Sequence, residues 1–250
     1  MIGILDSGIG GENTLREIRR YSSVDVILMK DTKNAPYGVL TEEELLPIIE
    51  RNVCELISLG ASTVLLACCT ASSVWHRLGT AARTSSIPII VPTAAVAREK
   101  TKTKRVAVMA TAGTVARHAF AKALRPIEVM EIAAGELVSA IEGGVSDDTV
   151  TPREIKRISS LLSPLPDFGA DTLVLGCTHF PSLERTVRTV ASRYGIKHIV
   201  SSAEAGASAL LGECRECGTG KTVIIDTGRT APRDEKRKET KKWENTDAEE

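Results

Sequence analysis

The chain has 250 residues, of which 42% are hydrophobic and 26% charged, so it is long enough to bury a core in one or two α/β domains. Its formal net charge is +0, which leaves no global field to attract nucleic acid or an anionic membrane, and neither is expected as a partner. No apolar run is long enough to span a bilayer, and the first residues contain no basic leader, so we expect a cytoplasmic protein.

Short aliphatic runs recur along the chain, each followed by a Gly/Ser/Thr turn and a helix-like stretch. Such continuous runs are typical of strands that are buried on both faces. A capping box at residues 41–44 predicts the start of a helix that extends to Leu59. Strands that alternate with helices predict a mostly parallel sheet with right-handed crossovers. The predicted strands are residues 2–5, 24–29, 63–67, 87–91, 105–110, 127–132, 172–175, 198–200 and 223–225.

The sequence contains an internal repeat. Residues 59–73 (LGASTVLLACCTASS) and 168–182 (FGADTLVLGCTHFPS) share Gly-Ala-X-Thr, an aliphatic run, and a cysteine followed by small hydroxylated residues. Residues 2–10 and 106–114 also match each other, at a similar offset. The repeat predicts two pseudo-symmetric α/β domains, each a mostly parallel sheet flanked by helices.

The repeat also sets the expected domain boundaries. The first domain comprises residues 1–92 together with 205–228, which return to it as a helix and a strand, and the second comprises residues 93–204. A turn signal at Pro92 marks the crossing between them. Residues 229–250 form a mixed-charge run with almost no apolar side chains, so a disordered tail is expected there.

Six cysteines are too few for a disulfide scaffold in a chain of this length, so we expect free thiols that fill the core, bind metal or react. Cys214 and Cys217 have the spacing of a zinc knuckle, but a structural zinc needs four ligands and the sequence offers no second suitable pair. No lysine lies in a context typical of a Schiff base. Neither a metal nor a cofactor is therefore predicted.

Cys68 and Cys177 each lie just past the carboxyl end of a predicted strand, where open α/β sheets bind ligands. A single buried cysteine in such a place is usually an inert core residue. A pair in duplicated contexts, each closely followed by a threonine, favours two thiols that face one cleft between the domains. Two thiols on opposite faces of a tetrahedral carbon can remove a proton from one side and return a proton from the other.

Asp6 and His179 are candidates for passing protons to and from these thiols. Taken singly, Asp6 is explained as a helix cap and His179 as an ordinary hydrogen-bonding residue. Their positions, at a strand end of the first domain and beside the second cysteine, favour an acid/base role. The hydroxyls of Thr70 and Thr178, together with nearby helix N-termini, supply donors that suit carboxylates and favour a thiolate.

Five segments resemble the motifs of the aspartate/glutamate racemase family, in the right order and spacing, over about residues 2–228. Each motif alone is weak, whereas five in register are a specific signal. They are residues 6–11 (DSGIGG), 36–38 (PYG), 67–72 (ACCTAS), 111–115 (TAGTV) and 175–181 (LGCTHFP).

The resemblance implies a cofactor-independent racemase that interconverts L- and D-glutamate and supplies D-glutamate for peptidoglycan. It implies that Cys68 and Cys177 are the two catalytic thiols, assisted by Asp6 and His179, in an active site between the domains. Glu142 resembles an acid of the second domain that accompanies these motifs. The family's substrate-contacting positions fall on Asp6, Ser7, Tyr37, Gly38, Cys69, Thr70, Thr114, Thr178 and His179.

The chain departs from the family at Cys69, where the family usually has asparagine. A thiol lacks the donor and acceptor of an amide, so the identity of the substrate is left open. One alternative is a racemase or decarboxylase of another acidic or hydantoin-like substrate, such as aspartate. Another is a catalytically silent protein that binds an acidic amino acid or a partner. A homodimer is compatible with the sequence.

Overall fold

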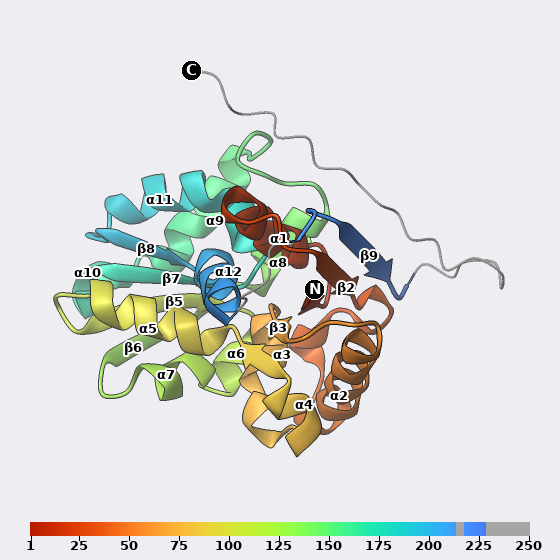
Figure 1. The fold of residues 1–250 in the computed structure, drawn as a ribbon. Coiled ribbons are helices and arrows are strands. Elements are labelled where there is room, and N and C mark those ends of the chain that lie inside the picture. Colours follow the sequence, from red (N-terminus) through yellow and green to blue (C-terminus); the bar gives the residue numbers. More distant parts are fainter. Residues whose placement is uncertain (214–217, 229–250) are drawn as a thin grey trace.

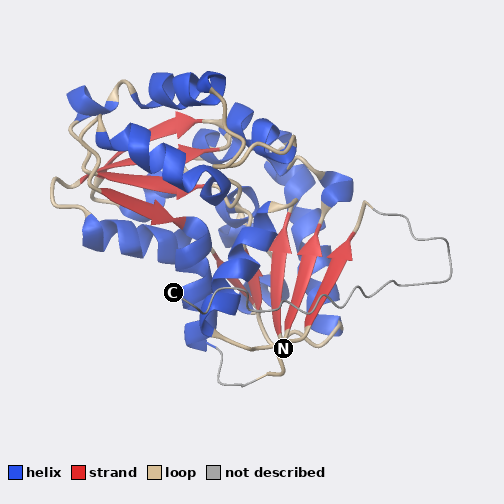
Figure 2. Cartoon of the chain, turned by 90° about the horizontal axis from the view of Figure 1, so that it is seen from above, coloured by secondary structure: helices blue, strands red, loops and turns tan. Residues whose placement is uncertain are grey.

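The computed structural model describes residues 1–213 and 218–228, so the predictions for Cys214, Cys217 and residues 229–250 lie outside the described residues. Two parallel sheets dominate the described part, of five and four strands. Each sheet is flanked by helices (Figures 1 and 2). The predicted α/β architecture with two parallel sheets is therefore confirmed.

The elements follow one another in strand–helix alternation. The first sheet contains the strands β1 (Ile2–Asp6), β2 (Val26–Lys30), β3 (Val64–Leu66), β4 (Ser86–Pro88) and β9 (Thr222–Asp226). The second contains β5 (Arg105–Ala110), β6 (Glu128–Ala133), β7 (Thr172–Gly176) and β8 (His198–Ser201). The α-helices are α1 (Gly10–Tyr21), α2 (Glu42–Ser58), α3 (Cys69–Ser73), α4 (Thr80–Thr84), α5 (Ile90–Lys100), α6 (Ala112–Ala116), α7 (Ala119–Leu124), α8 (Gly135–Glu142), α9 (Pro152–Leu162), α10 (Leu165–Phe168), α11 (Glu184–Ser192) and α12 (Ser202–Glu213). Short 3-10 helices are η1 (Thr32–Asn34), η2 (Tyr37–Val39), η3 (Trp75–Arg77) and η4 (Phe180–Leu183).

The two sheets share one strand order. It is β4-β3-β1-β2-β9 in the first sheet and β6-β5-β7-β8 in the second. If the strands of each repeat are numbered from its start, both sheets contain the order 2-1-3-4, and β9 is added to the first sheet beside β2. This common order is what a duplicated α/β unit produces. We call the part built on the first sheet the first half, and the part built on the second sheet the second half.

Two helices connect the halves. Helix α5 leads from β4 to β5 and packs against α7, β7 and β8, whereas α12 leads from β8 to β9 and packs against α1. The two helices also pack against each other, near the centre of Figure 1. Pro92, where the sequence indicated a crossing, lies in the first turn of α5.

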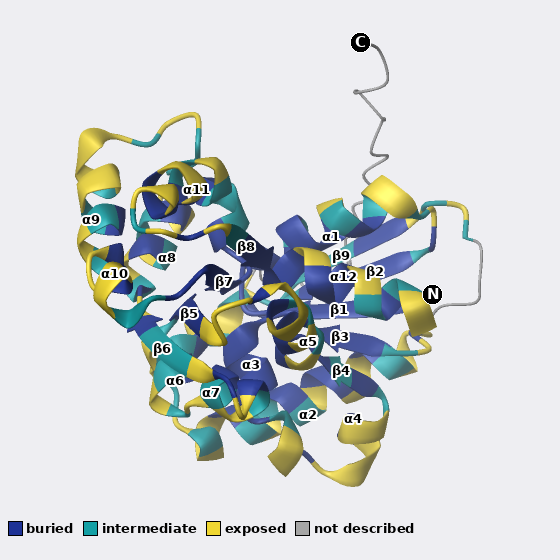
Figure 3. Cartoon of the chain, turned by 90° about the vertical axis from the view of Figure 1, so that its left-hand side faces the viewer, coloured by how far each residue is buried: buried dark blue, intermediate teal, exposed yellow. Residues whose placement is uncertain are grey.

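The core explains the aliphatic runs of the sequence. All five residues of β1 and all five of β7 are buried, as expected for parallel strands covered on both faces. Figure 3 shows buried strands beneath helices whose outer faces are exposed. One apolar cluster includes both Ile4 of β1 and Val174 of β7, so the halves are joined by continuous apolar packing.

Helix α2 begins where its capping signal predicted. The Thr41 hydroxyl accepts a hydrogen bond from the backbone N–H of Glu44 at 3.3 Å, and the Glu44 carboxylate accepts one from the backbone N–H of Thr41 at 2.8 Å. These reciprocal bonds satisfy two donors that the helix itself leaves unpaired. The helix ends at Ser58, close to the predicted end at Leu59.

Candidate active site

The first half brings Asp6, Ser7 and Cys68 to one edge of its sheet. Strands β1 and β3 are parallel neighbours, with Leu5 opposite Leu66, so the residues that follow them emerge side by side. The Ser7 hydroxyl lies 3.5 Å from the Cys68 sulfur, within hydrogen-bonding distance. Only 8% of the surface of Cys68 is exposed. The first candidate thiol is thus held in a nearly dry environment.

The second half repeats this arrangement with a histidine. Cys177 directly follows β7, and its sulfur lies 3.5 Å from Nδ1 of His179. Nε2 of the same ring lies 3.1 Å from the Glu142 carboxylate at the end of α8. Carboxylate, imidazole and sulfur therefore form a hydrogen-bonded relay, in which the acid orients the ring toward the thiol.

The turn that carries Cys177 contacts the Asp6 turn of the first half. The Thr178 hydroxyl donates a hydrogen bond of 2.8 Å to one oxygen of Asp6, and the backbone N–H of Gly8 donates one of 2.9 Å to the other. A Cβ atom at Gly10 would lie 2.9 Å from Nδ1 of His179, so only glycine permits this approach. The structure thus brings three of the predicted residues, Asp6, Thr178 and His179, into one contact between the halves.

Burial and charge shift the pKa values of the groups around both thiols. Burial, with Asp6 nearby, raises the pKa of Cys68 to about 12. Burial also raises the pKa of Asp6, although the charge of His179 opposes this change. Desolvation favours a neutral His179 ring, but the charges of Cys177, Glu142 and Asp6 outweigh it and raise the pKa of His179 to about 11. Both shifts favour the protonated form, the thiol of Cys68 and the imidazolium of His179.

Three hydroxyls form a cluster between the halves. Thr70 of α3 lies 2.9 Å from Thr111 and 3.3 Å from Thr114, and these two lie 3.0 Å from each other. Thr70 and Thr114 were predicted to contact the substrate. Thr111 was not, although it directly follows β5 and accepts a hydrogen bond from the N–H of Thr114, a role that its position before a helix could have indicated.

Tyr37 is held by a buried acid. Its hydroxyl donates a hydrogen bond of 2.6 Å to Asp31, whose carboxylate also accepts one of 2.9 Å from Asn52. Burial, together with this carboxylate, raises the pKa of Tyr37. The neighbouring Gly38 meets the other half through its backbone, because a Cβ atom at Gly113 would lie 2.6 Å from the Gly38 oxygen. The Asp31 network therefore fixes the loop that reaches the second half.

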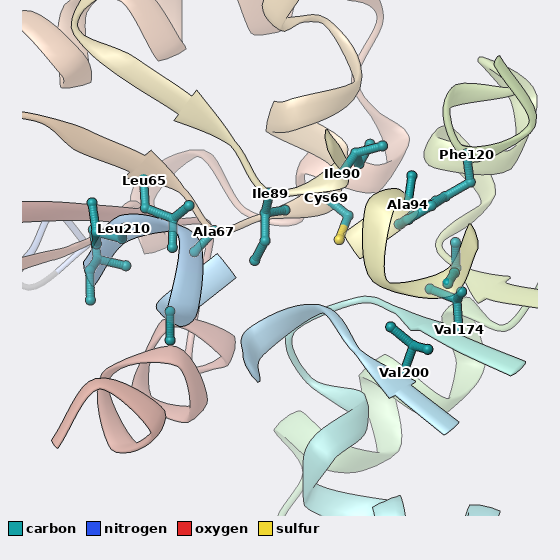
Figure 4. Close-up of a cluster of buried hydrophobic side chains, with 14 of the residues drawn as sticks. Leu65, Ala67, Cys69, Ile89, Ile90, Ala94, Phe120, Val174, Val200 and Leu210 are labelled. Atoms are coloured by element: carbon teal, nitrogen blue, oxygen red, sulfur yellow. The ribbon is translucent and has the colours of Figure 1, made fainter. Parts of the chain in front are cut away.

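Cys69 has different surroundings from Cys68. Its side chain is 2% exposed and belongs to an apolar cluster with Ala94, Val174 and Val200, which come from α5, β7 and β8 (Figure 4). Burial raises the pKa of its thiol well above the ordinary value. Its predicted contact with substrate stays a prediction, and its side chain packs among apolar residues.

Two polar residues at the contact between the halves were missed. Asn13 of α1 donates a hydrogen bond of 2.7 Å to the carbonyl of Thr178. Arg117, which follows α6, donates one of 2.7 Å to the carbonyl of Leu40 in the first half. For Asn13, a polar residue three positions after Gly10 on the buried face of a helix is the only signal that the sequence offers.

Two cavities of about 330 and 370 Å³ are lined from both halves, and both include Glu42 and Arg117. Neither lining includes Cys68 or Cys177. Within residues 1–213 and 218–228, no group of three or more His, Cys, Asp or Glu side chains is placed to hold a metal ion. Over the same residues, no helix is long and apolar enough to cross a membrane.

Comparisons with known proteins identify relatives. Residues 24–210 match the family described as Asp/Glu/Hydantoin racemase. Glutamate racemase of Deinococcus radiodurans is 36% identical over 196 residues, which span 75% of this chain and 66% of that protein, just under two thirds of its length. Glutamate racemase of Aquifex aeolicus is 31% identical over 237 residues, 92% of this chain and 89% of that protein. The structure of glutamate racemase isoform RacE1 from Bacillus anthracis superposes with a TM-score of 0.79 at 28% identity, covering 92% of this chain and 89% of that one.

Proposed function

This chain belongs to the Asp/Glu/hydantoin racemase family, and we propose that it interconverts L- and D-glutamate without a cofactor, supplying D-glutamate for peptidoglycan. One observation carries the proposal. Cys68 and Cys177 follow equivalent strands of two similar halves, and the turn that carries Cys177 contacts the Asp6 turn, whose Ser7 hydroxyl lies 3.5 Å from the Cys68 sulfur. The curated relatives compared above are glutamate racemases.

In this proposal the two thiols work from opposite faces of the α-carbon. In one direction Cys177, as a thiolate beside the His179 imidazolium, removes the α-proton. Cys68 then gives its own proton to the opposite face and is left as the thiolate. In the other direction Cys68 is the base and Cys177 the acid, and Asp6 and His179 assist the return of protons. No proton is gained or lost over the cycle.

The α-proton of an amino acid is very weakly acidic, so the carbanion-like state needs strong stabilisation. The hydroxyls of Thr70 and Thr114 are buried, and we propose that they donate hydrogen bonds to the substrate carboxylates. The Thr178 hydroxyl donates to Asp6, so we propose that Thr178 contacts the substrate through its backbone N–H. In a site with little water, each such bond is stronger than in solution. Ser7 and the Tyr37–Gly38 loop complete the proposed substrate contacts.

Isotope exchange tests the proposal. L-glutamate, D-glutamate and the two aspartate enantiomers are each incubated with the protein in heavy water, and α-deuterium and optical rotation are followed. We expect both glutamate enantiomers to racemise with deuterium at the α-carbon. Exchange of aspartate in preference to glutamate would change the substrate. Thermal stabilisation by glutamate without any exchange would identify a silent binding protein.

Substitution of the cysteines tests the mechanism. Cys68→Ser and Cys177→Ser are each expected to abolish racemisation and to leave the circular dichroism spectrum unchanged. Cys54→Ser is the matched control, because Cys54 is an exposed free cysteine on α2 and its loss should not alter turnover. A Cys68 or Cys177 variant with near-normal turnover would remove that residue from the mechanism.

A further inference from the structure

Thr178 joins the halves through both its side chain and its backbone. Its hydroxyl donates to Asp6 at 2.8 Å, and its carbonyl accepts a hydrogen bond of 2.7 Å from the side-chain amide of Asn13. Thr178 is 1% exposed and Asn13 is 6% exposed, so neither bond competes strongly with water. Because Thr178 lies between Cys177 and His179, a bond to its carbonyl restrains the peptide that carries both.

The amide of Asn13 is itself oriented. Its nitrogen also donates to the hydroxyl of Ser182 at 3.3 Å, and its oxygen accepts from the guanidinium of Arg16 at 3.1 Å. These partners fix which end of the amide faces Thr178. An asparagine on the buried face of a helix is unfavourable for helix propensity and for desolvation. The contact with the second half compensates for that cost.

We propose that Asn13 is a positioning residue for the second thiol, and this inference rests on the proposed function. By holding the Thr178 carbonyl, its amide fixes the direction of the Cys177 sulfur and the His179 ring. Asn13 makes no hydrogen bond to either side chain. Cys68, on the other side of the proposed substrate, is held by Ser7 instead. Loss of the Asn13 amide therefore impairs one of the two proton transfers selectively.

A fault on one side has a distinctive kinetic signature. Enantiomers have equal free energy in water, so the kcat/KM values of the two directions stay equal to each other in every variant. Their ratio therefore cannot show which proton transfer is impaired, whereas kinetic isotope effects can. Where Cys177 is the base, its slower abstraction becomes more rate-limiting, and the isotope effect of α-deuterated substrate rises. Where Cys177 is the acid, its proton donation becomes the slow step, so the earlier abstraction by Cys68 becomes reversible. The isotope effect of α-deuterated substrate then falls, and the solvent isotope effect rises because the thiol proton comes from solvent.

The experiment compares Asn13→Leu and Asn13→Asp with the wild-type protein. Both variants lose the donor to Thr178, and the second keeps the shape of the side chain if the first fails to fold. We expect kcat to fall by about tenfold to a hundredfold, the scale for a misplaced reacting group. The substrate isotope effects should move in opposite senses for L- and D-glutamate. Ser182→Ala, which removes only the longer hydrogen bond of Asn13, should retain wild-type isotope effects.

The possible failures are distinguishable. A wild-type protein that does not racemise its substrate overturns the proposed function, and this inference with it. A wild-type protein that racemises glutamate, with Asn13 variants whose isotope effects are unchanged or move in the same sense for both enantiomers, overturns the inference alone. In that case Asn13 contributes only to general packing.

Discussion

Asp171 anchors the connection by which the chain first passes between the halves, and its removal is a test of that connection. The residue is 3% exposed and immediately precedes β7. Its carboxylate accepts hydrogen bonds of 2.7–3.0 Å from Thr101, Lys102, Thr103 and Thr172. The first three of these residues form the loop between α5 and β5.

The pKa of Asp171 gives the size of its contribution to the free energy of unfolding. Burial by itself raises the pKa of Asp171, but the hydrogen bonds outweigh it and lower the pKa from 3.8 to about 2. Because the folded-state pKa is the lower one, the carboxylate stabilises the fold above about pH 4, and this contribution is lost as the pH falls toward 2. At about 1.4 kcal/mol per pKa unit, the difference corresponds to about 2 kcal/mol at neutral pH.

Urea unfolding of wild-type protein and Asp171→Asn between pH 2 and pH 7 measures this contribution. We expect the variant to be less stable by at least about 2 kcal/mol at pH 7, with a gap that narrows as the pH falls from 4 to 2. Asp167→Asn on the exposed surface of α10 is the control and should change little. A gap that stays constant over this pH range would refute the reasoning, because the charge would then contribute nothing.

Three further changes have defined outcomes. Gly10→Ala should cost about 1–3 kcal/mol in urea unfolding and slow racemisation, since its Cβ would press on His179, whereas Gly135→Ala, with open space around its Cα, should do neither. Tyr37→Phe removes a buried bond to a carboxylate and should cost about 1.5–3 kcal/mol, so an unchanged urea midpoint would contradict that bond. Glu142→Gln removes a charge that raises the pKa of His179, so the alkaline limb of the pH–rate profile should move to lower pH, and a move upward would exclude the relay.

The sequence predicted those features that depend on short stretches of chain. Parallel strands covered on both faces need continuous apolar runs, so β1 and β7 were visible without coordinates. The motifs also located the turns after these strands. Cys68 and Cys69 show the limit: the first has extended backbone at the start of α3 and the second is already helical, so adjacent thiols have different surroundings.

Contacts between the halves could not be predicted in this way. They depend on how two folded units are oriented, and a local pattern of hydrophobic and polar residues does not encode that orientation. Asn13 and Arg117 lie within or after helices, where a polar residue is ordinarily solvated. Only the packing of α1 and α6 against the opposite half gives these side chains their partners.

The return of β9 to the first sheet has a mechanical consequence. Since the polypeptide passes from one half to the other at α5 and again at α12, two covalent tethers limit how the halves can move. With a single connection the halves could rotate about it in any direction. With two connections, the main rotation left is about the line between α5 and α12. In the proposed reaction, this restriction would help to keep the two sulfur atoms in a constant relative placement.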